Sequence, residues 1–347
     1  MKEFRTAFAR IRLLLLLCSL LLVVAFSGIL GAQLGWADAW LSYEKAVEPE
    51  PWRPRDIATD LSDQQANAGL IRLGHDLITR TPELIGPLAE DVSKRFAGNN
   101  LTCQNCHLKA GTQAGAGSFV GVYNRFPQFR ARENKEGSLF ERIDGCMERS
   151  MNGIKLPADS EEMKAMVAYM QWLSEEVPVE EEEEKYKGFT TLELPEIKAD
   201  LTIGEAVFKR YCVACHGENG QGIRAGENTM YQYPPLWGSD SYNHGAGMHR
   251  VITAAEFIKA NMPYLLATYD KPVLTDEEAY HVAAYINSFE RPQKHNAQAD
   301  FPDVKLKPVS TPYGPWADTF PAEQHKYGPF QPIMRFYEQQ YNIKKNK

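Results

Sequence analysis

Positive charge is scarce in this 347-residue chain, where 38 lysines and arginines stand against 45 aspartates and glutamates. The net charge is −7, and the first 39 residues carry four basic and two acidic side chains, so the remainder carries −9. This acidic balance argues against a general nucleic-acid-binding protein. Charged residues at 24% exclude a bundle of membrane helices, and hydrophobic residues at 44% exclude a disordered chain.

Cysteine is also rare, with six residues, and their number is informative. Cys18 lies in an apolar leader, and the other five follow it. Five cysteines cannot all pair as disulfides, so one sulfur must have another role. Strand-like alternation of apolar and polar residues does not compete with the helical periodicity, so the predicted fold is all-α.

The leader, residues 1–39, has the pattern of an export signal. Basic residues up to Arg12 precede an uncharged run over residues 13–36. Small residues suit cleavage before Trp40, yet a helix over residues 13–34 is about 33 Å long and can cross a bilayer. A cleaved signal peptide and a retained membrane anchor are both open. Either one places the rest of the chain outside the cytoplasm, in the periplasm.

Beyond the leader, the chain divides into two similar segments, residues 55–177 and 201–291. A linker over residues 178–200 separates them, and its acidic run predicts a solvated connector. The tail, residues 292–347, is rich in proline and aromatic residues and lacks a core of its own. We expect it to wrap over the two segments in extended form, with disorder as the alternative.

The two segments have the same design: a helix, a Cys-x-x-Cys-His sequence, a loop rich in glycine and proline, and a final helix. The final helices share an Ala-Tyr pair ending at Tyr169 and Tyr285, which predicts a duplicated unit. Thr202 and Thr275 each begin a Thr-x-x-Glu sequence. These sequences predict capping boxes at the first and last helices of the second segment.

The pentapeptide Cys-x-x-Cys-His occurs at residues 103–107 and 212–216. Two thiols at this spacing can add to the two vinyl groups of a haem, and the histidine supplies the proximal nitrogen to iron. A dithiol redox site, a zinc site or disulfides would not explain a histidine after both second cysteines. We therefore predict two covalently bound haem c groups, attached through Cys103, Cys106, Cys212 and Cys215, with His107 and His216 as proximal ligands.

At these motifs the chain resembles the c-type cytochromes, and residues 234–236 match the proline loop of that family. The resemblance implies that a proline carbonyl orients each proximal histidine, with Pro127 as the counterpart in the first segment. It also implies that Met262, in a Met-Pro sequence, is the sixth ligand of the second haem, with Met248 as the second choice.

The odd cysteine, Cys146, occupies the matching place in the first segment. Met262 lies 23 residues before Tyr285, and Cys146 lies 23 residues before Tyr169. The duplication therefore predicts Cys146 as an iron ligand, where a thiolate lowers the potential and is itself a nucleophile. A His/Met haem with a spectator cysteine is the alternative, because two methionines follow Cys146 within five residues.

Cations gather around Cys146 in this otherwise acidic chain, and guanidinium groups there would attract small dianions. Ser150 lies one turn after Cys146 and can donate a hydrogen bond to a bound oxyanion, unless it only caps the helix. The nearby cations are Arg125, Arg130, Arg132, Arg142, Arg149 and Lys155.

The stretch over residues 142–153 resembles the thiosulfate dehydrogenases, dihaem enzymes that form tetrathionate. The likeness extends through residues 245–248 and 261–263 to residues 327–330 in the tail. In that family the catalytic haem has His/Cys ligands, and the second haem has His/Met or His/Lys ligands. Asn261 precedes the methionine here, so the lysine version is absent.

The resemblance implies oxidation of two thiosulfate ions to tetrathionate, with reversal possible. Thiosulfate would bind at Cys146, held by Arg132, Arg142 and Ser150. Electrons would pass through the second haem to a soluble or membrane-bound cytochrome or another acceptor. Two alternatives stay open: a dihaem electron carrier, and a transferase that loads sulfur from thiosulfate onto a carrier protein.

Overall fold

The computed structural model describes residues 2–34, 52–178, 184–226, 229–345 and 347, and its backbone contacts define two units, residues 1–53 and 54–347. In the first unit, α1 (Lys2–Gln33) is exposed and apolar, and Phe4–Gln33 is long enough to cross a membrane. A signal sequence has the same properties. The expected cleavage point before Trp40 lies outside the described residues.

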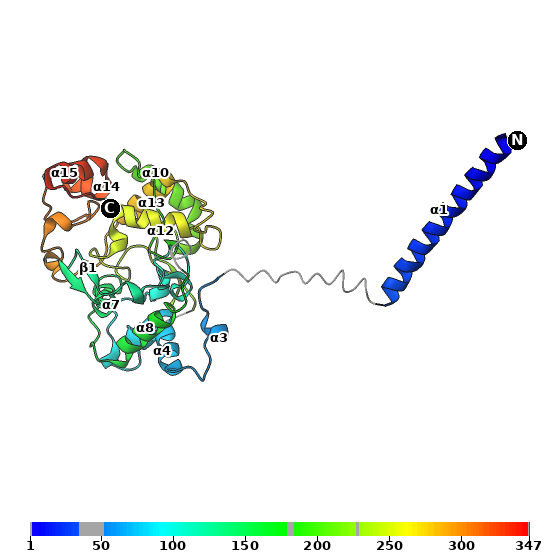
Figure 1. Cartoon of the computed structure of the whole chain (residues 1–347). Coiled ribbons are helices and arrows are strands. Elements are labelled where there is room, and N and C mark those ends of the chain that lie inside the picture. The colour runs from blue at the N-terminus through cyan, green and yellow to red at the C-terminus, as the bar shows by residue number, and fades with distance from the viewer. Residues whose placement is uncertain (1, 35–51, 179–183, 227–228, 346) are drawn as a thin grey trace. The chain divides into compact units, whose positions relative to one another are not determined.

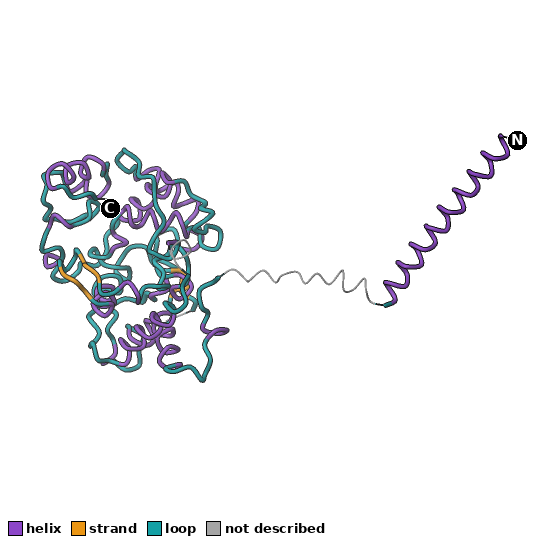
Figure 2. The backbone as a smooth tube through the Cα atoms, viewed as in Figure 1, coloured by secondary structure: helices purple, strands orange, loops and turns teal. Residues whose placement is uncertain are grey.

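The second unit is mostly helical with a few short strands (Figures 1 and 2), which confirms the predicted fold class. The helices of its first segment are α3 (Ile57–Asp60), α4 (Ala68–Thr79), α5 (Thr81–Ile85), α6 (Leu108–Gly111), α7 (Leu139–Met147) and α8 (Glu161–Trp172). Those of its second segment are α10 (Leu201–Tyr211), α11 (Val213–His216), α12 (Val251–Asn261) and α13 (Asp276–Ser288).

Two antiparallel hairpins interrupt the helices. The first joins β1 (Gln128–Arg130) to β2 (Lys135–Gly137), and the second joins β3 (Ile223–Arg224) to β4 (Tyr231–Tyr233). Strands of two or three residues are too short to produce a readable alternation of apolar and polar side chains. The sequence therefore gave no sign of them.

The same helix crossing occurs in both segments, where α4 packs on α8 and α10 packs on α13. A glycine makes each crossing close. A Cβ on Gly74 would lie 2.1 Å from the Ala165 carbonyl oxygen, and one on Gly204 would lie 2.3 Å from that of His281. Ala165 and His281 each stand four residues before the tyrosine used to align the segments. The equivalent contacts support a duplicated unit.

The predicted capping boxes have different outcomes. At α13 the box is present: the Glu278 amide donates to Thr275 Oγ1 at 3.1 Å, and the Thr275 amide donates to Glu278 Oε2 at 3.0 Å. At α10 the predicted box is wrong, because Asp200 caps the helix and accepts from the Thr202 amide at 2.7 Å. Thr202 therefore lies inside the helix.

The described part of the linker, residues 184–200, is packed against the protein, whereas the solvated connector was predicted from the acidic run. The Gly115 amide donates to the Lys185 carbonyl at 2.9 Å, and the Gly117 amide donates to the Gly188 carbonyl at 2.8 Å. Further along, apolar linker side chains join the second core. Residues 179–183, which hold most of the acidic run, lie outside the described residues.

The tail has a helical end, where a wholly extended form was expected. Phe330, Ile333 and Tyr337 are at most 1% exposed and belong to the core of the second segment. Their spacing is that of one helix face, which buries them together. The two tail helices are α14 (Ala322–Tyr327) and α15 (Gln331–Tyr341).

Candidate active site

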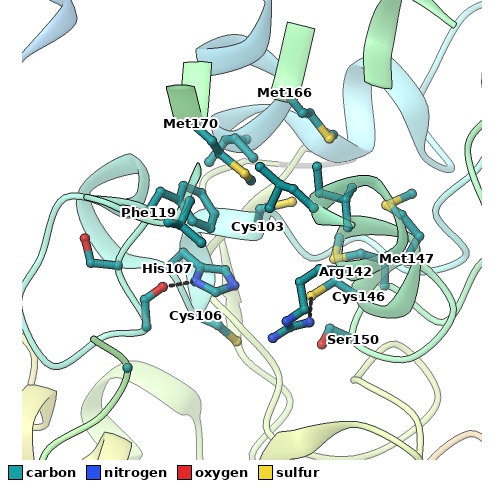
Figure 3. A pocket seen from close by; sticks show the side chains of 18 of the residues that line it. Cys103, Cys106, His107, Phe119, Arg142, Cys146, Met147, Ser150, Met166 and Met170 are labelled. Carbon is teal, nitrogen blue, oxygen red and sulfur yellow. Dashed lines mark hydrogen bonds between the residues drawn. The ribbon is translucent and has the colours of Figure 1, made fainter. Parts of the chain in front are cut away.

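The first Cys-x-x-Cys-His sequence borders a cavity of about 310 Å³. Cys103, Cys106 and His107 form one side, and Cys146 faces His107 from α7 across the cavity (Figure 3). Apolar side chains from α4, α7, α8 and the loops complete the walls: Ile78, Phe119, Leu139, Met147, Met166 and Met170. The structure thus brings together the predicted attachment residues, the proximal histidine and the odd cysteine.

His107 is oriented by a glycine carbonyl. Its Nδ1 lies 2.6 Å from the Gly117 oxygen, so Nδ1 donates and Nε2 is left to face the cavity. The expected proline carbonyl at Pro127 does not take this part. Gly117 has a φ of +61°, which favours glycine, and a Cβ there would lie 3.4 Å from His107 Nδ1. A backbone carbonyl leaves no mark in a sequence, which explains the error.

Cys146 is held as a thiolate acceptor by its own helix. Arg142, one turn earlier on α7, donates from Nη1 to Cys146 Sγ at 2.9 Å. Burial raises the pKa of the thiol, but the charge of Arg142 and the contacts with His107 outweigh it and lower the pKa to about 6. By contrast, burial raises the pKa of Cys103 to about 11 and that of Cys106 to about 12. Among the three thiols that line this cavity, Cys146 is therefore the one whose pKa is lowered.

The permanently charged side chains that line this cavity, among the described residues, are all cations: Arg125, Arg142 and Lys187. Ser150 also lines it and lies near Cys146 and Arg142 (Figure 3). Lys187 comes from the linker and was missed, because a lone lysine in a polar connector carries no signal. Lys187 also forms an ion pair with Glu184 at 3.5 Å, so Arg125 and Arg142 provide most of the attraction for a small dianion.

Arg132 does not line the cavity, although it was expected to hold the substrate. It donates from Nη1 to Asp300 Oδ2 at 2.6 Å and to the Gly245 carbonyl at 3.1 Å. Arg149 also binds Asp300, with Nη2 at 2.6 Å from Oδ1. Asp300 belongs to the tail, so no local pattern linked it to these arginines. Both guanidinium groups are therefore paired with Asp300 in a buried ion-pair cluster.

The second Cys-x-x-Cys-His sequence borders a larger cavity, of about 620 Å³, lined by Cys212, Cys215 and His216. His216 Nδ1 donates to the Pro234 carbonyl at 2.7 Å, as the proline loop predicted. Met262, directly after α12, and Met248 both line this cavity. Both methionines that were predicted as candidates for the sixth ligand therefore border this cavity.

The two cavities are neighbours. Four residues line both of them: Leu101, Cys106, Tyr242 and Met248. Tyr242 is buried, and its hydroxyl donates to Asn287 Oδ1 at 3.1 Å. Each cavity combines a thiol pair and a histidine with apolar walls, and both volumes lie in the range of about 300–1,000 Å³ for ligand pockets. The residues present fit two covalently attached haems.

Comparison with known proteins identifies both segments. Residues 89–179 match the SoxA/TsdA cytochrome c domain, and residues 201–290 match the cytochrome c family. Over 201 residues, the chain is 45% identical to the thiosulfate dehydrogenase of Allochromatium vinosum, an alignment covering 57% of this chain and 72% of the relative. The chain belongs to the thiosulfate dehydrogenase family. It carries two covalently bound c-type haems, one in each cytochrome c domain.

Two further relatives show how far the likeness extends. The thiosulfate dehydrogenase of Stutzerimonas stutzeri is 42% identical over 200 residues, covering 57% of this chain and 62% of the relative. The solved structure of thiosulfate dehydrogenase TsdBA from Marichromatium purpuratum, in its as-isolated form, is 34% identical with a TM-score of 0.62. That match covers 71% of this chain and 50% of TsdBA, so the chain spans about half the length of that relative.

Proposed function

We propose that this chain oxidises two thiosulfate ions to tetrathionate, with Cys146 as the reacting sulfur. The observation that carries this proposal is the first cavity, where a low-pKa thiol faces a proximal histidine, and where the permanently charged lining side chains among the described residues are cations. In the same proposal, Cys103, Cys106, Cys212 and Cys215 attach the two haems. The iron ligands are His107 with Cys146, and His216 with Met262.

The reaction divides into two steps at Cys146. In the first, the thiolate forms a bond to the outer sulfur of thiosulfate, and two electrons leave: Cys–S⁻ + S–SO₃²⁻ → Cys–S–S–SO₃⁻ + 2 e⁻. When bound, the haems accept these electrons, one each. In the second step, the outer sulfur of another thiosulfate attacks the adduct, which releases O₃S–S–S–SO₃²⁻ and restores the thiolate.

Three cavity residues assist these steps. Arg142 attracts the approaching dianion. It also stabilises the Cys146 thiolate, which is the nucleophile of the first step and the leaving group of the second. Ser150 donates a hydrogen bond to a sulfonate oxygen. Lys187 adds positive charge on the linker side, which helps a second dianion to approach the charged adduct.

The electrons leave through the second segment to an external acceptor, a cytochrome or another redox protein. The shared wall of Tyr242 and Met248 supports transfer between the two cavities, because it leaves little protein between them. Export to the periplasm through α1, as a signal peptide or as an anchor, completes this proposal. Haem c attachment outside the cytoplasm agrees with that location.

The decisive experiment measures thiosulfate-dependent reduction of an acceptor and tetrathionate formation by the purified holoprotein and its Cys146→Ala variant. We expect the activity to be lost, and the thiolate-type low-spin signal in electron paramagnetic resonance to disappear. Met151→Leu serves as the matched control and should keep both. Full activity in Cys146→Ala would overturn the proposal. Tetrathionate formed without any carrier protein separates this reaction from the sulfur-transferase alternative.

A further inference from the structure

The loop over residues 113–117 touches both ligand environments. At one end, Gly117 provides the carbonyl that accepts from His107 Nδ1 at 2.6 Å. At the other end, the loop is hydrogen-bonded to Asn261, which immediately precedes Met262. His107 belongs to the first cavity and Met262 to the second. This short loop therefore contacts His107, which faces the first cavity, and Asn261, which precedes the Met262 of the second cavity.

Asn261 is fully buried, and its side-chain amide joins the loop to α12. Its Oδ1 accepts from Gln113 Nε2 at 2.7 Å, and its Nδ2 donates to the Gly115 carbonyl at 2.8 Å. The same Nδ2 donates to the Phe257 carbonyl, one turn earlier on α12, at 2.9 Å. With both donors and the acceptor engaged, the amide has one orientation, and it fixes the end of α12 from which Met262 follows.

The fit between the loop and α12 is close. Gly115 has a φ of +69°, and a Cβ there would lie 2.9 Å from both Ala260 Cβ and Tyr269 Cδ2. The linker supports the other side of the loop through the bonds from Gly115 and Gly117 to linker carbonyls. The loop is therefore confined from two sides, and a shift at either end is passed to the other.

We propose that Gln113 and Asn261 are positioning residues that couple the proximal side of the first haem to the distal side of the second. Through them, the orientation of His107 and the placement of Met262 depend on one another. The two reduction potentials are consequently linked, and a change made in one segment alters the haem of the other. This coupling goes beyond thiosulfate chemistry and does not require it.

The test compares the holoproteins of Gln113→Ala and Asn261→Ala with the parent by potentiometric titration and electron paramagnetic resonance. Gln113 lines neither cavity, yet we expect Gln113→Ala to shift the potential of the second haem. We expect Asn261→Ala to shift the potential and the low-spin signal of the first. Loss of one hydrogen bond corresponds to roughly a two- to tenfold change in each redox equilibrium constant.

Gln331→Ala is the matched control, because its amide also bonds two backbone carbonyls, those of Leu194 and Pro195, away from both cavities. It should leave both potentials unchanged. Shifts confined to the haem of the mutated segment, or equal shifts in the control, would overturn the coupling. If Asn261→Ala fails to fold, the partly exposed Gln113→Ala still decides the question. No readout uses thiosulfate, so a negative result leaves the proposed activity standing.

Discussion

Cys146 and Arg142 lie one turn apart on α7, so their contact is a property of the helix itself. The guanidinium donates to the sulfur at 2.9 Å, while Ser138 and Glu141 cap the helix start with a complete capping box. The contact therefore does not depend on a flexible loop. It holds the thiolate in place before any substrate arrives.

At the scale of the residue, we predict that replacing Arg142 lowers the activity with thiosulfate. Arg142→Gln removes a charge-assisted hydrogen bond worth about 1.5 kcal/mol at this exposed site, so kcat/KM for thiosulfate should fall about tenfold. Steady-state kinetics with thiosulfate check this. Arg142→Lys should restore part of the loss, and Arg335→Gln, an exposed change in the tail, should cause none. Parent-like kinetics in Arg142→Gln would remove Arg142 from the site.

Single residues of the site differ in how well a sequence can reveal them. Cys146 could be singled out because a duplicated unit placed it at the position of Met262, and spacing is preserved in a sequence. Arg132 was misplaced because its partner, Asp300, lies 168 residues further along the chain. Gly117 was missed because its contribution to the site is a backbone carbonyl, which any residue type possesses.

At the scale of the element, the two Thr-x-x-Glu sequences look alike, but replacing their threonines should change the free energy of unfolding by different amounts. Thr275→Ala removes the cap of α13 and should lower the free energy of unfolding by about 0.5–2 kcal/mol. Thr202→Ala should change it by less than about 0.5 kcal/mol, because Asp200 caps α10. Denaturant titration of both variants measures the difference. Equal losses in the two would contradict the caps assigned here.

Helices were predictable from the sequence where the periodic spacing of their apolar residues extends over several turns. The final helix of each segment was expected from its apolar spacing, and α8 and α13 confirm it. The hairpins were missed because strands of two or three residues show no alternation. In the tail, α15 was hidden among prolines and aromatic residues, and its helical face is stabilised by the core of the second segment.

At the scale of the whole molecule, the two segments are not independent bodies. Residues 54–347 form one compact unit, and the two cavities share part of their walls. The tail contacts both segments. Its helices fill the second core, while Asp300 binds two arginines and the Phe301 amide donates to the Arg132 carbonyl at 2.8 Å in the first segment.

The Asp300 cluster makes a prediction about acid stability. Burial alone would raise the pKa of Asp300, but Arg149 and Arg132 overcome this and lower it to about 2 from the usual 3.8. A carboxylate whose pKa is depressed by folding stabilises the protein fully above the unfolded value, and this contribution disappears as the pH falls through the folded value. The stabilisation should therefore be complete above about pH 4 and be lost towards pH 2.

Asp300→Asn tests this directly, because it leaves buried Arg149 without its nearest carboxylate and with only Glu133 at 3.8 Å. We expect a loss of about 3–5 kcal/mol in the free energy of unfolding near pH 7. The difference from the parent protein should narrow as the pH falls from about 4 towards 2, since the parent then loses the same charge. Denaturant titrations across this pH range measure it. Asp303→Asn, which removes a charge three residues away and keeps a capping oxygen, should show neither effect. A pH-independent difference for Asp300→Asn would mean that packing, and not the buried carboxylate, joins the tail to the first segment.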